Sequence, residues 1–264
     1  MSKRKKLITT AVWILLAVSI CVTLFSGYKL CEGLQIYKEG DQSYEILKQQ
    51  ARHQEDRENN EERTETQTDI PPVSIDFETL KKINSDAAAW LYCPDTPIDY
   101  PVMRSDDYDW YLHHLPDGTY NANGTLFFDY NCPEDFSGRL SIIYGHHMKS
   151  GKMFGSLKGY KKQEYFEQHP SLYLYTEQEN YRIDLIYGLV IGAGKWRERA
   201  FMYELNLEEL LEYASAKTTF KSDMEYTGSD KFVVLATCSY EFDDARYIVI
   251  GVLRPEAVLT ACKR

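Results

Sequence analysis

The chain has 264 residues, of which 44% are hydrophobic, so we expect one or at most two domains with a substantial core. Its formal net charge of −10 argues against a protein that binds nucleic-acid phosphates through a basic face. Positive charge is concentrated at the N-terminus, where Lys3, Arg4, Lys5 and Lys6 precede an apolar run.

The apolar run covers residues 7–28, which are 22 residues without a charge. As a helix it would span roughly 33 Å, enough to cross a bilayer core of about 30 Å. The basic residues 3–6 predict that residues 1–6 form a cytoplasmic tail, with everything after Tyr28 outside the cell. A cleaved signal peptide is the alternative. It fits less well because the run exceeds the usual apolar region of about 7–15 residues and no small-x-small cleavage site follows.

Residues 29–72 are expected to form an extracellular stalk. Residues 29–50 carry spaced apolar side chains, which predict a helix that continues out of the membrane and breaks near Gly40. Ten of the twenty residues from 51 to 70 are charged, so this stretch is expected to stay solvated. Pro71 and Pro72 end the stalk, and the folded domain is expected over residues 73–264.

Short strands dominate the folded domain in chain order. They are predicted over residues 87–92, 98–103, 125–130, 140–144, 171–175, 181–191, 232–235 and 247–253. Helical segments are predicted over residues 77–84 with Asp76 as N-cap, 106–114, 153–160, and 206–217 with Asn206 as N-cap. This order favours a closed or nearly closed β-barrel decorated with helices over alternating βαβ units.

The last two strands carry the most reactive pair of side chains. Cys238 ends the first strand and Arg246 begins the second, which places a thiol and a fixed cation at the rim of the sheet. Such a pair needs a base to become a nucleophilic site. His146 and His147 are the candidates, because they directly follow the strand over residues 140–144. The other histidines lie in segments that favour surface or structural roles: His53, His113, His114 and His169.

The remaining cysteines fit neither a zinc site nor a dense disulfide framework. They are Cys21, Cys31, Cys93, Cys132 and Cys262. A bridge between Cys93 and Cys132 is conceivable, and the alternative is that both are small buried hydrophobic residues. The sequence contains no metal-ligand cluster, and we expect neither a metal nor a cofactor.

Several segments together resemble a known family. They are Ile98-Asp-Tyr-Pro-Val102, Tyr111-Leu-His-His114, Phe128-Asp-Tyr130, Tyr144-Gly-His-His-Met-Lys-Ser-Gly-Lys-Met-Phe-Gly-Ser-Leu157, His169-Pro170, Leu235-Ala-Thr-Cys-Ser-Tyr-Glu-Phe242 and Asp244-Ala-Arg246. In this order behind an N-terminal anchor, the chain resembles the sortases, the membrane-anchored cysteine transpeptidases of Gram-positive cell surfaces. It is similar to class B in particular, over most of residues 77–253.

The resemblance implies a mainly β fold: a closed eight-stranded β-barrel with N-terminal helices. It also implies an inserted helix before the cysteine strand, which residues 206–217 match. The family pattern assigns catalytic roles to His146, Cys238 and Arg246, with His147 as the rival one residue away. It also implies a substrate groove beside the cysteine, lined by the segment with Ile98, Tyr100 and Val102 and by the loop around the inserted helix. Ala236, Thr237 and Ser239 are adjacent to the thiol and are assigned to the same groove. The alternative for Tyr100 and Val102 is that they belong to the core. Val234 and Ala236 depart from the family's usual threonine and serine, so the resemblance does not extend to the details of substrate recognition at these positions.

The resemblance also implies a mechanism. Cys238 would act as a thiolate and His146 as the acid that protonates the leaving amine. Arg246 would stabilise the oxyanion, and the alternative for it is a surface ion pair with Asp243 or Asp244. The thioacyl enzyme made from a sorting-signal-bearing surface protein would then be resolved by an amine of a peptidoglycan precursor or a pilin.

Two other classes of function remain open at this point. An extracellular membrane-anchored cysteine protease would share Cys238 and His146 but release the peptide to water. A non-catalytic anchored scaffold would tolerate loss of the thiol. The reaction product distinguishes the first class, and a Cys238→Ala variant distinguishes the second.

Overall fold

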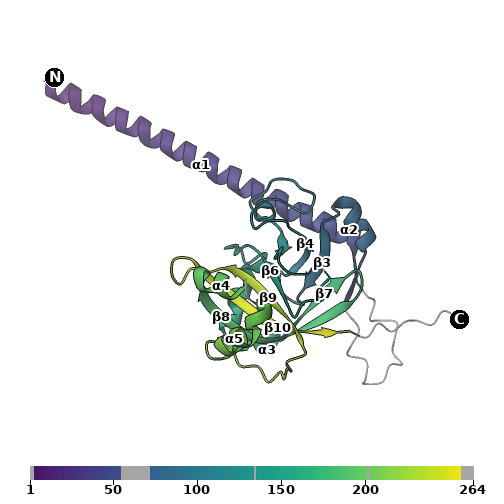
Figure 1. The fold of residues 1–264 in the computed structure, drawn as a ribbon. Coiled ribbons are helices and arrows are strands. Elements are labelled where there is room, and N and C mark those ends of the chain that lie inside the picture. The colour runs from purple at the N-terminus through teal and green to yellow at the C-terminus, as the bar shows by residue number, and fades with distance from the viewer. Residues whose placement is uncertain (1–2, 55–71, 134, 201–202, 257–264) are drawn as a thin grey trace.

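The computed structural model describes residues 3–54, 72–133, 135–200 and 203–256. Eight strands form a closed barrel in the order β10-β8-β7-β3-β4-β5-β6-β9 (Figure 1). Their bounds are β3 Ala87–Tyr92, β4 Asp99–Met103, β5 Leu126–Phe128, β6 Leu140–Tyr144, β7 Ser171–Thr176, β8 Asn180–Gly192, β9 Lys231–Cys238 and β10 Ala245–Pro255. The pairs β4–β5 and β6–β9 are parallel and the others are antiparallel. The predicted closed eight-stranded barrel is confirmed.

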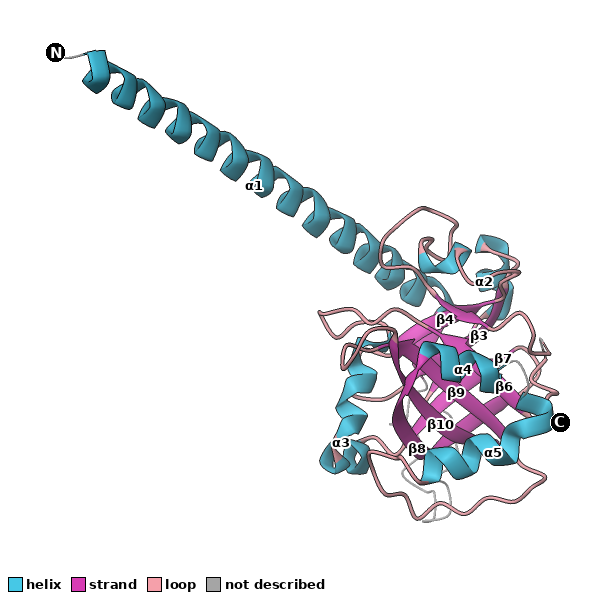
Figure 2. Cartoon of the chain, turned by 60° about the vertical axis from the view of Figure 1, so that its left-hand side comes forward, coloured by secondary structure: helices cyan, strands magenta, loops and turns pink. Residues whose placement is uncertain are grey.

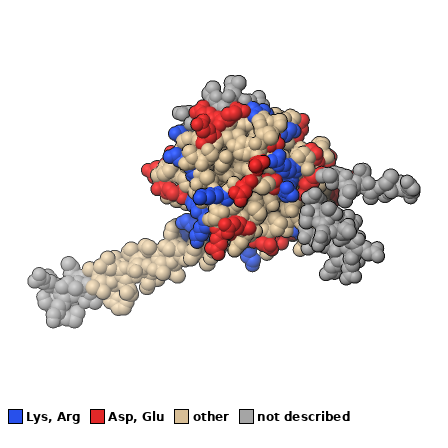
Figure 3. All heavy atoms as spheres, turned by 90° about the horizontal axis from the view of Figure 1, so that it is seen from below, with Lys and Arg blue, Asp and Glu red and all other residues tan. Residues whose placement is uncertain are grey.

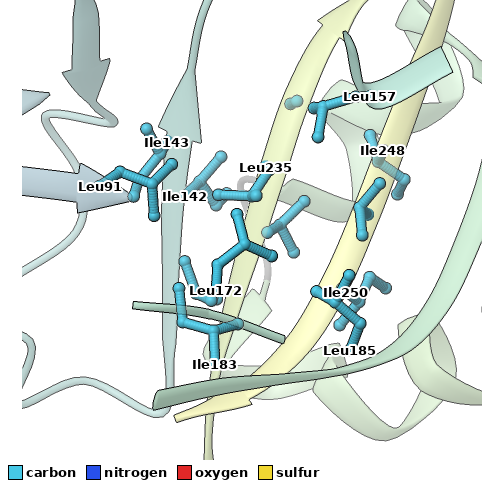
Figure 4. Close-up of a cluster of buried hydrophobic side chains, with 14 of the residues drawn as sticks. Leu91, Ile142, Ile143, Leu157, Leu172, Ile183, Leu185, Leu235, Ile248 and Ile250 are labelled. Carbon is cyan, nitrogen blue, oxygen red and sulfur yellow. The ribbon is translucent and has the colours of Figure 1, made fainter. Parts of the chain in front are cut away.

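Branched aliphatic side chains fill the barrel. Figure 4 shows Ile142 from β6, Leu235 from β9 and Ile250 from β10 in one cluster, and all three are fully buried. Both faces of β9 are covered, so Phe232 to Thr237 read as a continuous buried run and not as an alternating one. β-Branched residues pack well on such pleated surfaces, which explains why these segments form strands.

Short helices cover the outside of the barrel. They are α2 (Phe77–Ile83), η2 (Trp110–Leu112), η3 (Phe154–Lys161), α3 (Gln163–Gln168), α4 (Ala193–Ala200) and α5 (Tyr203–Ser215). Figure 2 shows α4 and α5 lying across the side of the barrel formed by β8, β9 and β10. The predicted cap of the first helix is confirmed, because the Asp76 carboxylate accepts a hydrogen bond of 3.0 Å from the Thr79 amide.

Two helix predictions differ from the structure. The inserted helix α5 begins at Tyr203, so Asn206 lies inside it and the prediction of Asn206 as N-cap is wrong. The preceding residues Tyr203, Glu204 and Leu205 tolerate a helix well enough for it to start earlier. The helix predicted over residues 106–114 is replaced by the short 3-10 helix η2. The Asp107 carboxylate accepts hydrogen bonds from the amides of Asp109 and Trp110, which favours a turn before η2.

The N-terminal helix α1 (Lys3–Ala51) runs without interruption for 49 residues. The predicted break near Gly40 is therefore wrong. Gly40 is buried against Asn123, and a Cβ atom at this position would lie 2.2 Å from Asn123 Nδ2. Gly40 permits a close approach of α1 to the barrel. Glycine also commonly interrupts helices, and for that reason the sequence predicted a break at this position.

The C-terminal half of α1 is docked on the barrel. The Asn121 side chain donates to the Ile36 carbonyl over 2.9 Å, and the Asn123 side chain donates to the Tyr37 carbonyl over 3.2 Å. Tyr44 is buried and donates to the Gly124 carbonyl over 2.5 Å. After α1, the strand β1 (Arg52–Gln54) pairs with β2 (Val73–Ile75). Part of the expected stalk therefore packs on the barrel, whereas residues 55–71 lie outside the described residues.

The N-terminal half of α1 projects from the barrel. Among the described residues it is the one helix long and apolar enough to cross a membrane. Figure 3 shows this projecting part as a rod that carries neither blue nor red side chains between its grey tip and the approach to the barrel. Its exposed apolar surface is expected for a segment that lies in lipid.

Replacement of Gly40 by alanine is expected to loosen the docking of α1. The added Cβ collides with Asn123, so the free energy of unfolding should fall by about 1–3 kcal/mol. Gly33→Ala is the matched control, because nothing lies within 4 Å of its added Cβ. Urea unfolding of the full chain in detergent micelles measures both variants. Equal stability of the two would contradict the proposed close approach at Gly40.

Candidate active site

The rim of the barrel brings a thiol and a guanidinium together. Cys238 ends β9 and lies directly opposite Arg246 in the antiparallel register with β10. Directly opposed residues share one face of the sheet, with Cβ atoms about 4.5–5.5 Å apart. The Cys238 side chain is exposed although β9 is buried from Phe232 to Thr237. The connection between the strands is closed by a hydrogen bond of 2.9 Å from the Ser239 amide to the Ala245 carbonyl.

The second neighbour of β9 brings the histidines to the same rim. β6 runs parallel to β9 with Tyr144 opposite Ala236, and the Thr237 hydroxyl donates to the Gly145 carbonyl over 2.7 Å. β6 ends at Tyr144, and continuing its register by two residues beyond the strand would set His146 level with Cys238. If the alternation of side chains continued past the end of β6, His146 and not His147 would share the face of Cys238.

Each histidine has a defined backbone partner. His146 Nε2 lies 2.6 Å from the Leu112 carbonyl oxygen, so this nitrogen carries the proton and donates it. His147 Nδ1 lies 2.8 Å from the carbonyl oxygen of Cys238 and donates to it. His147 therefore supports the backbone of the cysteine. The Nδ1 atom of His146 is the ring nitrogen that does not take part in the bond to Leu112.

Comparison with known proteins identifies the fold. No family model matches the chain. The chain is 28% identical over 240 residues to sortase B of Listeria monocytogenes, which covers 89% of this chain and 94% of that protein. The structure of Bacillus anthracis sortase B matches with a TM-score of 0.65, 26% identity and coverage of 84% of this chain and 99% of that one. A Streptococcus pyogenes class B sortase involved in pilus biogenesis matches with a TM-score of 0.62, 29% identity and coverage of 67% and 97%. The chain belongs to the class B sortases.

Six residues of this sortase were predicted to line a substrate groove, and the structure buries all of them. They are Ile98, Tyr100, Val102, Ala236, Thr237 and Ser239. Tyr100 packs edge-on against Tyr44 of α1, beneath the docked helix. The hydroxyl groups of Thr237 and Ser239 bind Gly145 and Glu241 within the protein. Their side chains thus hold the strands of the rim in place, and their role in recognising a sorting signal stays a prediction.

Two exposed aromatic side chains lie in the connection that follows the thiol. Tyr240 and Phe242 lie in the connection between β9 and β10 and are 70% and 51% exposed. Tyr240 also meets the His147 ring edge-on, with 5.1 Å between centroids. The sequence analysis did not single out this pair. The available signal was two large aromatic residues among acidic ones in a short connection directly after the cysteine.

Arg246 forms no ion pair with any carboxylate among the described residues. Its Nη1 donates to the carbonyl of Ala245 over 3.0 Å. Across the described chain, Arg246 forms no ion pair, so the alternative pairing with Asp243 or Asp244 is not adopted. A guanidinium without a carboxylate partner keeps its donors available for a ligand.

The other barrel cysteines differ from Cys238 in their surroundings. Cys93 and Cys132 are both buried and form no disulfide with each other, which confirms the interpretation of them as small buried residues. Burial raises the pKa of the Cys93 thiol to about 11, so this group stays protonated at neutral pH.

Cys262 lies outside the described residues. Within the described ranges no group of histidine, cysteine and acidic residues could hold a metal ion.

The imidazole of His146 is expected to titrate below its usual value of about 6.5. Burial is the main cause of the lowered pKa, the Leu112 carbonyl opposes it, and the nearby His113 adds to it. Since unfolded His146 binds a proton more readily, acidification through about pH 6.5 should cost folding free energy. NMR titration of histidine-labelled protein, assigned with a His146→Asn variant, measures this pKa. A value at or above 6.5 would contradict the described burial.

Proposed function

We propose that this sortase is a cysteine transpeptidase that joins secreted surface proteins to a cell-envelope amine. The observation that supports this most strongly is the double pairing of β9. Pairing with β10 sets Arg246 opposite Cys238, and pairing with β6 sets Tyr144, two residues before His146, opposite Ala236, two residues before Cys238. A thiol, a titratable base and a fixed cation on one face of a sheet are the parts that acyl transfer requires.

The first half-reaction cleaves the sorting signal. The Cys238 thiolate attacks the carbonyl carbon of the scissile amide and forms a C–S bond. The tetrahedral intermediate collapses, and the C–N bond breaks as protonated His146 gives its proton to the leaving amine. Because burial lowers the pKa of His146, only a minority of molecules at neutral pH hold the thiolate together with the imidazolium. That pair is the active form.

The second half-reaction uses the same groups in reverse. An acceptor amine attacks the thioester carbonyl, and neutral His146 takes the proton that the amine loses. The C–S bond then breaks and Cys238 leaves as thiolate. In both halves the Arg246 guanidinium donates hydrogen bonds to the oxygen on which negative charge develops. We propose a peptidoglycan precursor or a pilin lysine as the source of the amine.

The chain is proposed to act outside the cell. Residues 7–28 of α1 would cross the membrane with residues 1–6 in the cytoplasm. Along α1, the Ile36 carbonyl accepts a hydrogen bond from the barrel, and it lies roughly 12 Å beyond Tyr28 along an unbroken helix. The barrel would therefore sit close to the outer surface of the membrane instead of at the end of a long flexible stalk.

A peptide library incubated with the full chain in micelles tests the transpeptidase proposal. With a panel of amines present, mass spectrometry should detect peptides joined to an amine and a thioacyl adduct on Cys238. Cys238→Ala should abolish both products. Cleaved peptide without any amine conjugate would instead indicate a protease. Unchanged attachment of surface proteins in cells that carry Cys238→Ala would indicate a scaffold.

Substitution of Arg246 tests its role at the oxyanion. Arg246→Ala should lower turnover of the best library peptide by about 10²–10³-fold, the usual cost of one oxyanion donor. The fold should persist, because Arg246 lies on the rim with one backbone partner. Arg246→Lys keeps the charge without the planar fork and should recover only part of the loss. Turnover of Arg246→Ala at the wild-type rate would exclude the oxyanion role.

A further inference from the structure

The connection between β9 and β10 crowds three carboxylates near Arg246. Glu241, Asp243 and Asp244 all lie within five residues of it in the sequence. A carboxylate bound to the guanidinium would neutralise its charge and occupy its donors. Arg246 nevertheless forms no ion pair with a carboxylate among the described residues. For Glu241, the structure shows a different partner that occupies its carboxylate.

Glu241 is held by Lys161 at the end of η3. The Lys161 ammonium forms an ion pair with the Glu241 carboxylate and also donates to the Ser239 hydroxyl over 3.2 Å. The Ser239 hydroxyl donates in turn to the same carboxylate. Two donors from two segments of the chain thus hold Glu241. Burial acts to raise the pKa of Glu241, but the hydrogen bonds from Lys161 and Ser239 outweigh it and lower that pKa to about 2.

The contact lies on the face of the sheet opposite the thiol. The Lys161 ammonium is 5.0 Å from the centroid of the Tyr247 ring. Tyr247 pairs with Thr237, whereas Arg246 pairs with Cys238. Because neighbouring residues of a strand point to opposite faces, Lys161 holds Glu241 away from the side chain of Arg246.

We propose that Lys161 is a positioning residue that keeps Arg246 unpaired by holding Glu241 on the opposite face of the sheet. Without Lys161, the Glu241 carboxylate in this exposed connection is released and pairs with Arg246. The cation beside the thiol is then neutralised. The proposal deepens the proposed function, because it concerns the charge that would stabilise the oxyanion. Lys161 itself touches neither the thiol nor the substrate in this account.

The test measures the charge beside Cys238 without any peptide substrate. The full chain in micelles is alkylated with iodoacetate or iodoacetamide, and mass spectrometry of the Cys238 peptide gives the two rates. Both reagents react with the thiolate, so its abundance cancels in their ratio. Only iodoacetate is negatively charged, so its relative rate reports an unpaired cation nearby.

The expected results form a cycle of variants. Lys161→Met and Arg246→Ala should each lower the iodoacetate-to-iodoacetamide ratio by about threefold, as expected for charges near a solvated surface. Lys161→Met should have no further effect in the Arg246→Ala background, because its influence runs through Arg246. Glu241→Gln added to Lys161→Met should restore the ratio, and Lys161→Arg should preserve it.

A matched control removes an equal charge from another ion pair near the rim. Lys152→Met breaks the ion pair of 2.6 Å between Lys152 and Asp41 and should leave the ratio unchanged. An unchanged ratio in Lys161→Met would overturn the proposal. So would additive losses in Lys161→Met and Arg246→Ala, because these would indicate a simple field effect. If Arg246→Ala itself had no effect, Arg246 would not face the thiol, and its proposed catalytic role would fail as well.

Discussion

The pairing of β9 with two different neighbours is the constraint on which the rest of the rim depends. An antiparallel register with β10 sets Arg246 opposite Cys238, and a parallel register with β6 sets Tyr144 opposite Ala236, close to the end of both strands. A shift of either register by one residue would turn the partner side chain to the other face. The Thr237 hydroxyl, bound to the Gly145 carbonyl, fastens the ends of β6 and β9 at this point. The proposed chemistry follows from sheet geometry more than from the loops.

The same rim is tied to the N-terminal helix. The loop that carries Asn121 and Asn123 binds the backbone of α1, and the segment after His147 reaches α1 through the ion pair of Lys152 with Asp41. Tyr44 adds a buried hydrogen bond to the Gly124 carbonyl. Since buried polar groups are costly to leave without partners, these contacts favour one orientation of helix and barrel. The proposed membrane span and the proposed reactive face would therefore be held in a fixed relation.

Much of this architecture could be predicted from the sequence, and the misses have physical causes. The strands were found because runs of β-branched residues mark them, and β6 matches its predicted bounds. The uninterrupted helix at Gly40 was missed because a glycine that breaks a helix looks the same as one that admits a close neighbour. Adjacency to Cys238 likewise could not show that Ala236 and Ser239 are buried. The contact of Lys161 with Glu241 joins residues 80 positions apart, which only the tertiary structure reveals.

The assignment of His146 rather than His147 to the face of Cys238 is the central claim. Single-turnover mass spectrometry of the thioacyl adduct tests it most directly, with one reactive peptide and the variants His146→Ala and His147→Ala. The account predicts that His146→Ala forms almost no adduct, whereas His147→Ala forms it at a rate within about tenfold of the wild type, because it loses only a hydrogen bond to the Cys238 carbonyl. Rapid adduct formation by His146→Ala together with its loss in His147→Ala would contradict the register on which the proposed mechanism is built.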